Sequence, residues 1–214
     1  VKMPKGVENK TGKDGFFPNG NFTFKDDFTA PKLDYRWIGL RGAREAFITT
    51  SKKGLEINPF DTNIKELKPT STLFYRQMHN AFSYTTTMQY KPNSEKDLAG
   101  VVALQNENSN YVFGITKKGT EYYILLQRNE RKRGSRETES TIVGSSKIDV
   151  KNPVTLQIKA NGDKYEFGYS TNGGDIINVG GPVSGDILST DVAGGFTGAL
   201  LGLYATTSND AIPQ

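Results

Sequence analysis

Few residues in this chain could carry out catalysis. Its 214 residues include one histidine, His79, and no cysteine, which excludes zinc sites built from several histidines and Cys–His nucleophile pairs. A Ser-His-Asp triad would need His79, which lies in QMHN at an expected corner between two strands. We interpret His79 as an exposed turn residue.

Carboxylate pairs are the remaining candidates for acid–base chemistry. Cleavage of a glycosidic bond needs two carboxyl groups at a defined distance across the sugar ring. Asp26 and Asp27 are neighbours on an expected strand, so their side chains would point to opposite faces. Glu137 and Glu139 would share a face, as many solvated strand carboxylates do, and Glu107 lies in a turn. We therefore assign no catalytic residue.

Motifs for charged ligands are incomplete. RNERKRGSR (128–136) lacks interleaved aromatic residues, and the net charge is only +4, so we expect a solvated loop and no nucleic-acid partner. The glycine-rich stretch 173–186 lacks the Lys-Ser/Thr ending of a phosphate loop. The corner Asn172–Asp175 offers oxygen ligands for structural calcium, although its spacing is not diagnostic. No metal ligand or cofactor is assigned, and no apolar run is long enough for a membrane span.

Exposed aromatic rings could contact a sugar. Trp37, Tyr35, Tyr111 and Phe196 are the candidates, and packing in the core or at its rim is the alternative for each. The polar stretch Asn106–Asn110 lies between two apolar runs, and we interpret it as a hairpin corner because Asn and Ser bond to the local backbone in turns.

The elements that would position these residues are short strands. Alternating or apolar runs separated by polar turns predict strands at 21–28, 54–57, 71–78, 80–90, 98–105, 111–115, 121–128, 138–144, 153–160, 163–170 and 196–205. Asn161-Gly162 predicts a hairpin with a type I′ turn. No window favours a helix. We predict an all-β fold, a two-sheet antiparallel β-sandwich or jelly roll over residues 21–214, preceded by a linker or surface arm at 1–20.

Four segments, in order and spacing, resemble a known family. DDFTAPKLDYRW (26–37), TLFYRQMHNAFSYTTTM (72–88), DLAGVVALQNENSNYVFGI (97–115) and GGFTGALLGLYA (194–205) resemble the C-terminal domain of family 43 glycoside hydrolases of the β-xylosidase type. The resemblance covers residues 24–205. It implies a concanavalin A-like jelly roll that follows an N-terminal five-bladed propeller, which holds the catalytic carboxylates on the same polypeptide. Such an enzyme trims xylan or arabinan, and we expect it to be secreted or periplasmic.

The resemblance also points to residues near the substrate. In the family, a sandwich loop places an aromatic side chain, usually Phe, at the rim of the propeller pocket, and residues 193–198 correspond to that loop. Relatives often have two consecutive Phe where this chain has Gly195 and Phe196, so Phe196 is expected either in the core or at the pocket wall. With Trp37, Tyr111 and Arg76 of the YRQ strand, it completes the set of residues expected near a xylo- or arabino-oligosaccharide.

The sequence is compatible with three functions. The first is a non-catalytic domain that packs against the propeller and helps close its active site. The second is an independent carbohydrate-binding module. The third is a free-standing lectin-like hydrolase, which would need paired carboxylates on one sheet. Relatives continue past GLYA into a further strand, so we expect an unpaired sheet edge unless the chain extends beyond Gln214.

Overall fold

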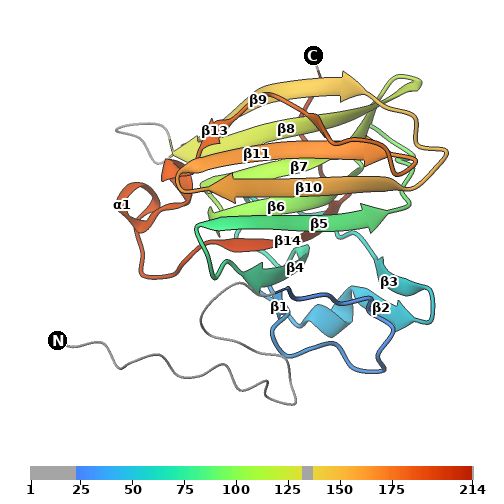
Figure 1. Cartoon of the computed structure of the whole chain (residues 1–214), viewed down its shortest axis with the longest axis horizontal. Coiled ribbons are helices and arrows are strands. Elements are labelled where there is room, and N and C mark those ends of the chain that lie inside the picture. The colour runs from blue at the N-terminus through green and yellow to red at the C-terminus, as the bar shows by residue number, and fades with distance from the viewer. Residues whose placement is uncertain (1–22, 132–136, 214) are drawn as a thin grey trace.

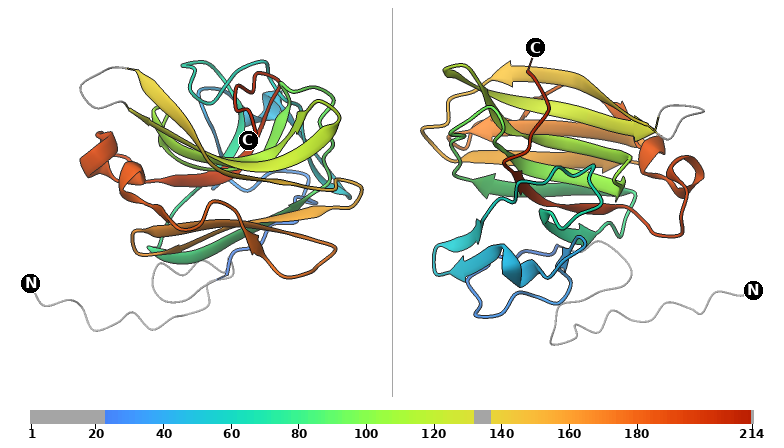
Figure 2. Two further views of the ribbon diagram at one scale, coloured as in Figure 1. Left: turned by 90° about the horizontal axis from the view of Figure 1, so that it is seen from above. Right: turned by 180° about the vertical axis from the view of Figure 1, so that it is seen from behind.

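Two stacked antiparallel sheets make up most of the chain (Figures 1 and 2). The computed structural model describes residues 23–131 and 137–213. The seven-stranded sheet runs in the order β1 (Ile38–Gly39), β4 (Ser71–Arg76), β14 (Leu200–Thr206), β6 (Leu98–Asn106), β7 (Ser109–Lys118), β8 (Glu121–Arg131) and β9 (Thr138–Lys147). The two-sheet antiparallel sandwich predicted from the sequence is confirmed.

The second sheet has five strands. Its order is β12 (Ile177–Asn178), β11 (Lys164–Thr171), β10 (Val154–Asn161) and β5 (Ala81–Met88), and β13 (Val183–Ser184) also pairs with β11. The smaller elements are a hairpin of β2 (Ile48–Ser51) and β3 (Gly54–Ile57), the 3₁₀ turns η1 (Arg44–Ala46) and η2 (Asp186–Leu188), and a single-turn helix, α1 (Thr190–Ala193). In the described residues, no helix is long and apolar enough to cross a membrane.

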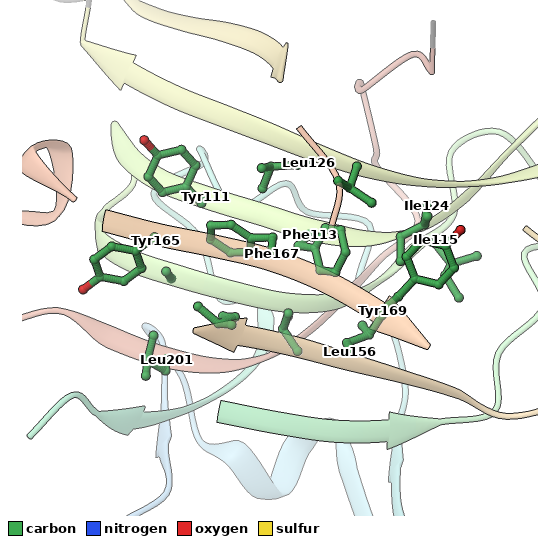
Figure 3. Packing of buried hydrophobic residues seen from close by; sticks show 14 of the residues in the cluster. Tyr111, Phe113, Ile115, Ile124, Leu126, Leu156, Tyr165, Phe167, Tyr169 and Leu201 are labelled. Atoms are coloured by element: carbon green, nitrogen blue, oxygen red, sulfur yellow. The ribbon is translucent and has the colours of Figure 1, made fainter. Parts of the chain in front are cut away.

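The main core fills the space between the two sheets (Figure 3). Alternation along β10 places Leu156 and Ile158 inward, while Gln157 between them faces the other side of the sheet. The Phe167 ring on β11 lies with its centroid 5.5 Å from that of Tyr111 and 5.7 Å from that of Phe113, both on β7. These rings join the two sheets through tilted aromatic packing.

A second apolar cluster covers the opposite face of the seven-stranded sheet, which we call the outer face. It includes Val102 of β6, Leu125 of β8 and Tyr204 of β14, together with Ile64 from the segment 58–70. The Ile64 amide donates to the Tyr204 hydroxyl at 3.0 Å, and burial raises the pKa of Tyr204. Because both faces are buried, β6 reads as a nearly continuous apolar run.

The expected strand at 21–28 is wrong for the described residues 23–28. The Asp26 carboxylate accepts the amide of Phe28 at 2.8 Å, and the Asp27 carboxylate accepts the amide of Thr29 at 3.0 Å. These local bonds compete with strand pairing. Phe28 has a φ of +57°, and its ring packs on the ring of Trp37. The two aspartates therefore stabilise a loop and do not project from a strand.

Two further expectations need correction. The β10–β11 hairpin is confirmed, but Asn161 pairs with Lys164, so the central turn residues are Gly162 and Asp163. Positive φ at Gly162 alone is the type II′ pattern rather than type I′.

The last strand begins at Leu200 instead of Phe196, and it pairs with both β4 and β6, so no unpaired edge opens at β14. The expected arm at 1–20 and residues 132–136 of the basic run lie outside the described residues.

Glycines of β6 and β7 lie so close together that a side chain added at one of them should destabilise the fold. Gly100 pairs with Gly114, and a Cβ at Gly100 would lie 2.1 Å from the Phe113 carbonyl oxygen. Gly100→Ala should therefore lower the free energy of unfolding by about 3 kcal/mol in urea titrations. Gly198→Ala is the control, because nothing lies within 4 Å of a Cβ there, and its effect should stay within about 0.5 kcal/mol. Equal stabilities for the two variants would contradict the close strand packing.

Candidate functional site

Four connections gather at one end of the sandwich, near α1 in Figure 1. They are the β4–β5 corner (77–80), the β6–β7 corner (107–108), the β10–β11 turn (162–163) and the segment 185–199, which holds η2, α1 and Phe196. We call this region the Phe196 end. Loops at the end of a rigid sandwich can vary without disturbing the core, and binding residues are concentrated on such loops.

Phe196 is fully exposed, with a relative accessibility of 106%. Of the two places expected for Phe196, the core is wrong, and the pocket wall stays a prediction. Gly194 and Gly195 have φ of 77° and 82°, a left-handed conformation that glycine adopts freely and that turns the chain outward after α1. Val192 and Met78 of the same end are also exposed, at 61% and 42%. Three large apolar side chains therefore face solvent at this end of the molecule.

A groove of about 470 Å³ lies beside this loop. Its lining includes Gln77, Met78, Tyr165 and Leu188. The Tyr165 hydroxyl donates to Gln77 Oε1 at 2.7 Å, and Gln77 Nε2 donates to the backbone oxygen of His79 at 3.0 Å. Burial raises the pKa of Tyr165. These polar groups hold the groove wall together, and His79 is half-buried in this wall rather than an exposed turn residue.

Two of the residues expected near sugar lie in the interior. Trp37 is 6% exposed, its indole N–H donates to Asp26 at 2.8 Å, and the rings of Phe24, Phe28 and Tyr75 surround it. Tyr111 is 1% exposed, and its hydroxyl donates to the Ser184 carbonyl at 2.7 Å, while burial raises its pKa to about 12. Neither residue offers a ring face to a sugar, so both are corrected to core residues.

Arg76, unlike Trp37 and Tyr111, lies at the surface. It is the last residue of β4, is exposed, and pairs with Leu200, the first residue of β14 after the Phe196 loop. The structure therefore brings Arg76 to the same end as Phe196. The Trp37 ring is not displayed with them, because it is buried against Phe24, Phe28 and Tyr75. Tyr35 is exposed at 83%, and the guanidinium of Arg36 lies 5.9 Å from its ring centroid.

The Asn-rich stretch 106–110 is a hairpin corner, as expected. Asn106 Oδ1 accepts the amide of Asn108 at 2.9 Å. Asn110 Nδ2 donates to the backbone oxygens of Asn106 and Glu107, both at 3.1 Å. Asn129 Nδ2 on β8 then donates to Asn110 Oδ1 at 2.8 Å, so the buried amides are paired with one another.

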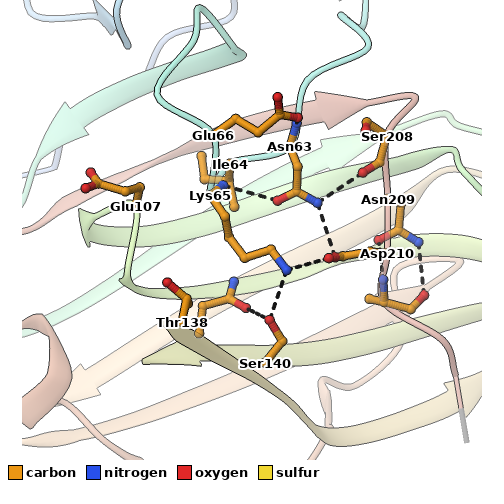
Figure 4. Close-up of polar contacts among 12 residues, drawn as sticks. Asn63, Ile64, Lys65, Glu66, Glu107, Thr138, Ser140, Ser208, Asn209 and Asp210 are labelled. Atoms are coloured by element: carbon orange, nitrogen blue, oxygen red, sulfur yellow. Dashed lines mark hydrogen bonds and ion pairs between the residues drawn. The ribbon is translucent and has the colours of Figure 1, made fainter. Parts of the chain in front are cut away.

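The carboxylates labelled in Figure 4, Glu66, Glu107 and Asp210, all have bonding partners in the fold, and the partner of Glu107 is not drawn there. Asp210 pairs with Lys65, and Glu107 pairs with Arg41 at 2.8 Å. The Asn63 amide, and then the ammonium of Lys68, lower the pKa of Glu66. The segments 58–70 and 207–213 lie across this face.

The carboxylates of Glu107, Asp210 and Glu66 are thus bonded within the fold. Asp163 and Asp186 line the groove at the Phe196 end. In residues 23–131 and 137–213, no three His, Cys, Asp or Glu side chains are grouped to hold a metal ion. Asn172 and Gly173 have φ of 56° and 69° and form a tight turn, and calcium at that corner stays a prediction.

Comparison with known proteins places this architecture in a family. The model of the β-xylosidase C-terminal concanavalin A-like domain, part of glycoside hydrolase family 43, matches residues 25–211. The crystal structure of a GH43_12 protein from a capybara gut metagenome is 44% identical with a TM-score of 0.86, over 96% of this chain and 38% of that one.

More distant relatives of this chain also belong to glycoside hydrolase family 43. The non-reducing end α-L-arabinofuranosidase BoGH43B of Bacteroides ovatus is 24% identical over 94% of this chain and 39% of its own length. The GH43 protein BlXynB of Bacillus licheniformis shares the fold, with a TM-score of 0.76 at 19% identity, over 87% of this chain and 36% of that one. This chain thus spans about two fifths of the length of these relatives.

The contrast between Phe196 and Trp37 can be tested by unfolding. Phe196→Ala should change the free energy of unfolding by less than about 0.5 kcal/mol, because the ring has no packing to lose. Trp37→Phe should lower it by about 1–3 kcal/mol, because Asp26 loses its indole donor. Urea titration followed by circular dichroism measures both variants. A loss of stability for Phe196→Ala as large as that for Trp37→Phe would show that the ring packs in the core.

Proposed function

The chain belongs to the family of C-terminal concanavalin A-like domains of β-xylosidases, and from this premise we propose that it is the non-catalytic part of a family 43 glycoside hydrolase. In this proposal it packs against an N-terminal five-bladed propeller of the same polypeptide and helps close the active site there. The substrates are the terminal sugars of xylan or of arabinan side chains. The propeller supplies the catalytic carboxylates, and the sandwich supplies part of the pocket wall.

The exposed Phe196 ring is the observation that carries this proposal. A phenylalanine side chain contributes about 1.5–3 kcal/mol when it is transferred from water to an apolar contact, and none of that is gained in this chain alone. Because Met78 and Val192 are exposed at the same end, the ring is one of several apolar groups available to a partner. An apolar ring at a pocket rim would limit the depth of the pocket and favour cleavage of terminal sugars.

The lengths of the relatives give independent support. The matched region is about two fifths of each of the longer proteins described above, one of which is named as an arabinofuranosidase. The remaining three fifths leave room for a catalytic domain. The bonded carboxylates of the outer face agree with a division of labour in which this domain does not perform the hydrolysis.

The alternative of an independent carbohydrate-binding module has less support. The outer face of the seven-stranded sheet is occupied by the protein's own segments. The solvent face of the five-stranded sheet is polar, with Ser83, Lys159 and Glu166 in one row and Thr87 beside Thr155 in another. Along these paired rows of the described strands, no aromatic ring faces outward to stack on a sugar.

Hydrolysis assays test the division of labour. We expect no turnover of aryl xylosides or aryl arabinofuranosides by this chain alone, because in this proposal the catalytic carboxylates lie on the propeller. In the polypeptide that joins it to the propeller, Phe196→Ala should lower kcat/KM by about 10-fold, as loss of one buried ring would. Turnover by the isolated chain that disappears on substitution of one carboxylate would contradict the proposal.

Calorimetry distinguishes the accessory domain from the binding module. Titration of this chain with xylo-oligosaccharides and arabino-oligosaccharides should give no heat of binding up to concentrations of about 1 mM, because no row of aromatic rings faces outward on the described strands of the five-stranded sheet. Wild-type protein and Phe196→Ala are titrated in parallel, so that weak contact at the exposed ring can be recognised. Saturable binding with a Kd of about 1 mM or tighter would favour the module instead.

A further inference from the structure

The loop that carries Phe196 has almost no packing of its own. Gly194, Gly195 and Gly198 fall within five residues, and nothing lies within 4 Å of a Cβ built at any of them. The Phe196 ring is fully exposed. Glycine loses more conformational freedom than any other residue when it is ordered, so this segment needs a specific restraint to hold one conformation.

Two side-chain amides provide that restraint. Gln105 Nε2 donates to the Thr197 carbonyl at 2.7 Å, and Asn106 Nδ2 donates to the Ala193 carbonyl at 3.2 Å. The two acceptors bracket residues 194–196, one on each side. The loop is therefore hydrogen-bonded on both sides of Phe196 to the end of β6. The Phe196 ring between these two bonds stays exposed.

Gln105 and Asn106 are consecutive residues, and consecutive side chains of a regular strand point to opposite faces. The register explains how both reach the same loop. Leu104 pairs with Asn110 and Asn106 pairs with Ser109, so Gln105 is an extra residue in β6, that is, a β-bulge. A bulge changes the direction of the side chains next to it.

Gln105 is buried, with 7% exposure, and its Oε1 is buried without a hydrogen-bond partner in the described part of the chain. An unpaired buried amide oxygen is destabilising, and an apolar side chain of the same size would avoid it. Packing alone therefore does not account for a glutamine here, whereas the bond from Nε2 to the loop does.

We propose that Gln105 and Asn106 are positioning residues, a clamp that fixes the Phe196 loop in the conformation needed by the neighbouring catalytic domain. The purpose of the clamp rests on the proposed function, but its existence does not, and it can be tested on this chain alone. By ordering the loop in advance, the clamp reduces the entropy lost when Phe196 meets the pocket.

Hydrogen exchange followed by mass spectrometry tests the clamp with two variants. Gln105→Met removes one bond with little change in volume. Asn106→Asp removes the donor to Ala193 and keeps the oxygen that accepts the Asn108 amide. The α1 amides of Ala193 and Gly194, which bond to the backbone oxygens of Ser189 and Thr190, should exchange about 5–10-fold faster in both variants. Gln157→Met, on the solvent side of β10, is the matched control and should change nothing.

Thermal unfolding separates positioning from a structural role. Gln105→Met should leave Tm unchanged or raise it, because the unpaired Oε1 is removed while the loop is released. A lower Tm with faster exchange across β6 and β14 would overturn the proposal, and so would unchanged exchange in residues 190–199 of both variants. If Gln105→Met does not fold, exchange in Asn106→Asp decides.

A double-mutant cycle in the polypeptide that includes the propeller tests whether the clamp orders the Phe196 loop for the catalytic domain. Gln105→Met should raise KM more than it lowers kcat, and this effect should disappear in the Phe196→Ala background. Faster hydrogen exchange in the loop together with unchanged KM and kcat would support the clamp and overturn the proposed function. Failure of the clamp and failure of the proposed function can therefore be distinguished.

Discussion

Both faces of the seven-stranded sheet must be kept from water, because its central strands carry apolar side chains on each side. The five-stranded sheet covers one face, and the segments 58–70 and 207–213 cover the other. The bond from the Ile64 amide to the Tyr204 hydroxyl joins one of these segments to the sheet at a buried position. The rest of the architecture follows from this double burial.

One consequence is that the chain itself covers much of the outer face of the large sheet. The outer face of the large sheet is occupied by the chain itself, with Lys65 and Asp210 paired over it. The solvent side of the small sheet is a polar array of the kind that keeps a sheet soluble. At the end of the sandwich Phe196, Val192 and Met78 are exposed together, and single apolar side chains such as Leu67 and Ile212 are exposed elsewhere.

A second consequence is mechanical. A rigid, doubly buried strand is a precise support for a loop, and β6 ends in the bulge from which Gln105 and Asn106 reach the Phe196 loop. The Asn-rich corner fixes the other end of this bulge through Asn110. Fold stability and display of an aromatic ring are thus linked through one short stretch of sequence, which agrees with a domain that shapes a neighbouring active site.

The sequence by itself determined the all-β class, most strands, the corner at 106–110 and the scarcity of catalytic groups, because these depend on local periodicity and residue type. It could not distinguish Trp37 and Tyr111 in the core from Phe196 at the surface, since all three are aromatic residues near turns. It also missed the clamp, because Gln105 and Thr197 are far apart in the chain. Only tertiary packing decides which ring is covered and which distant carbonyl an amide reaches.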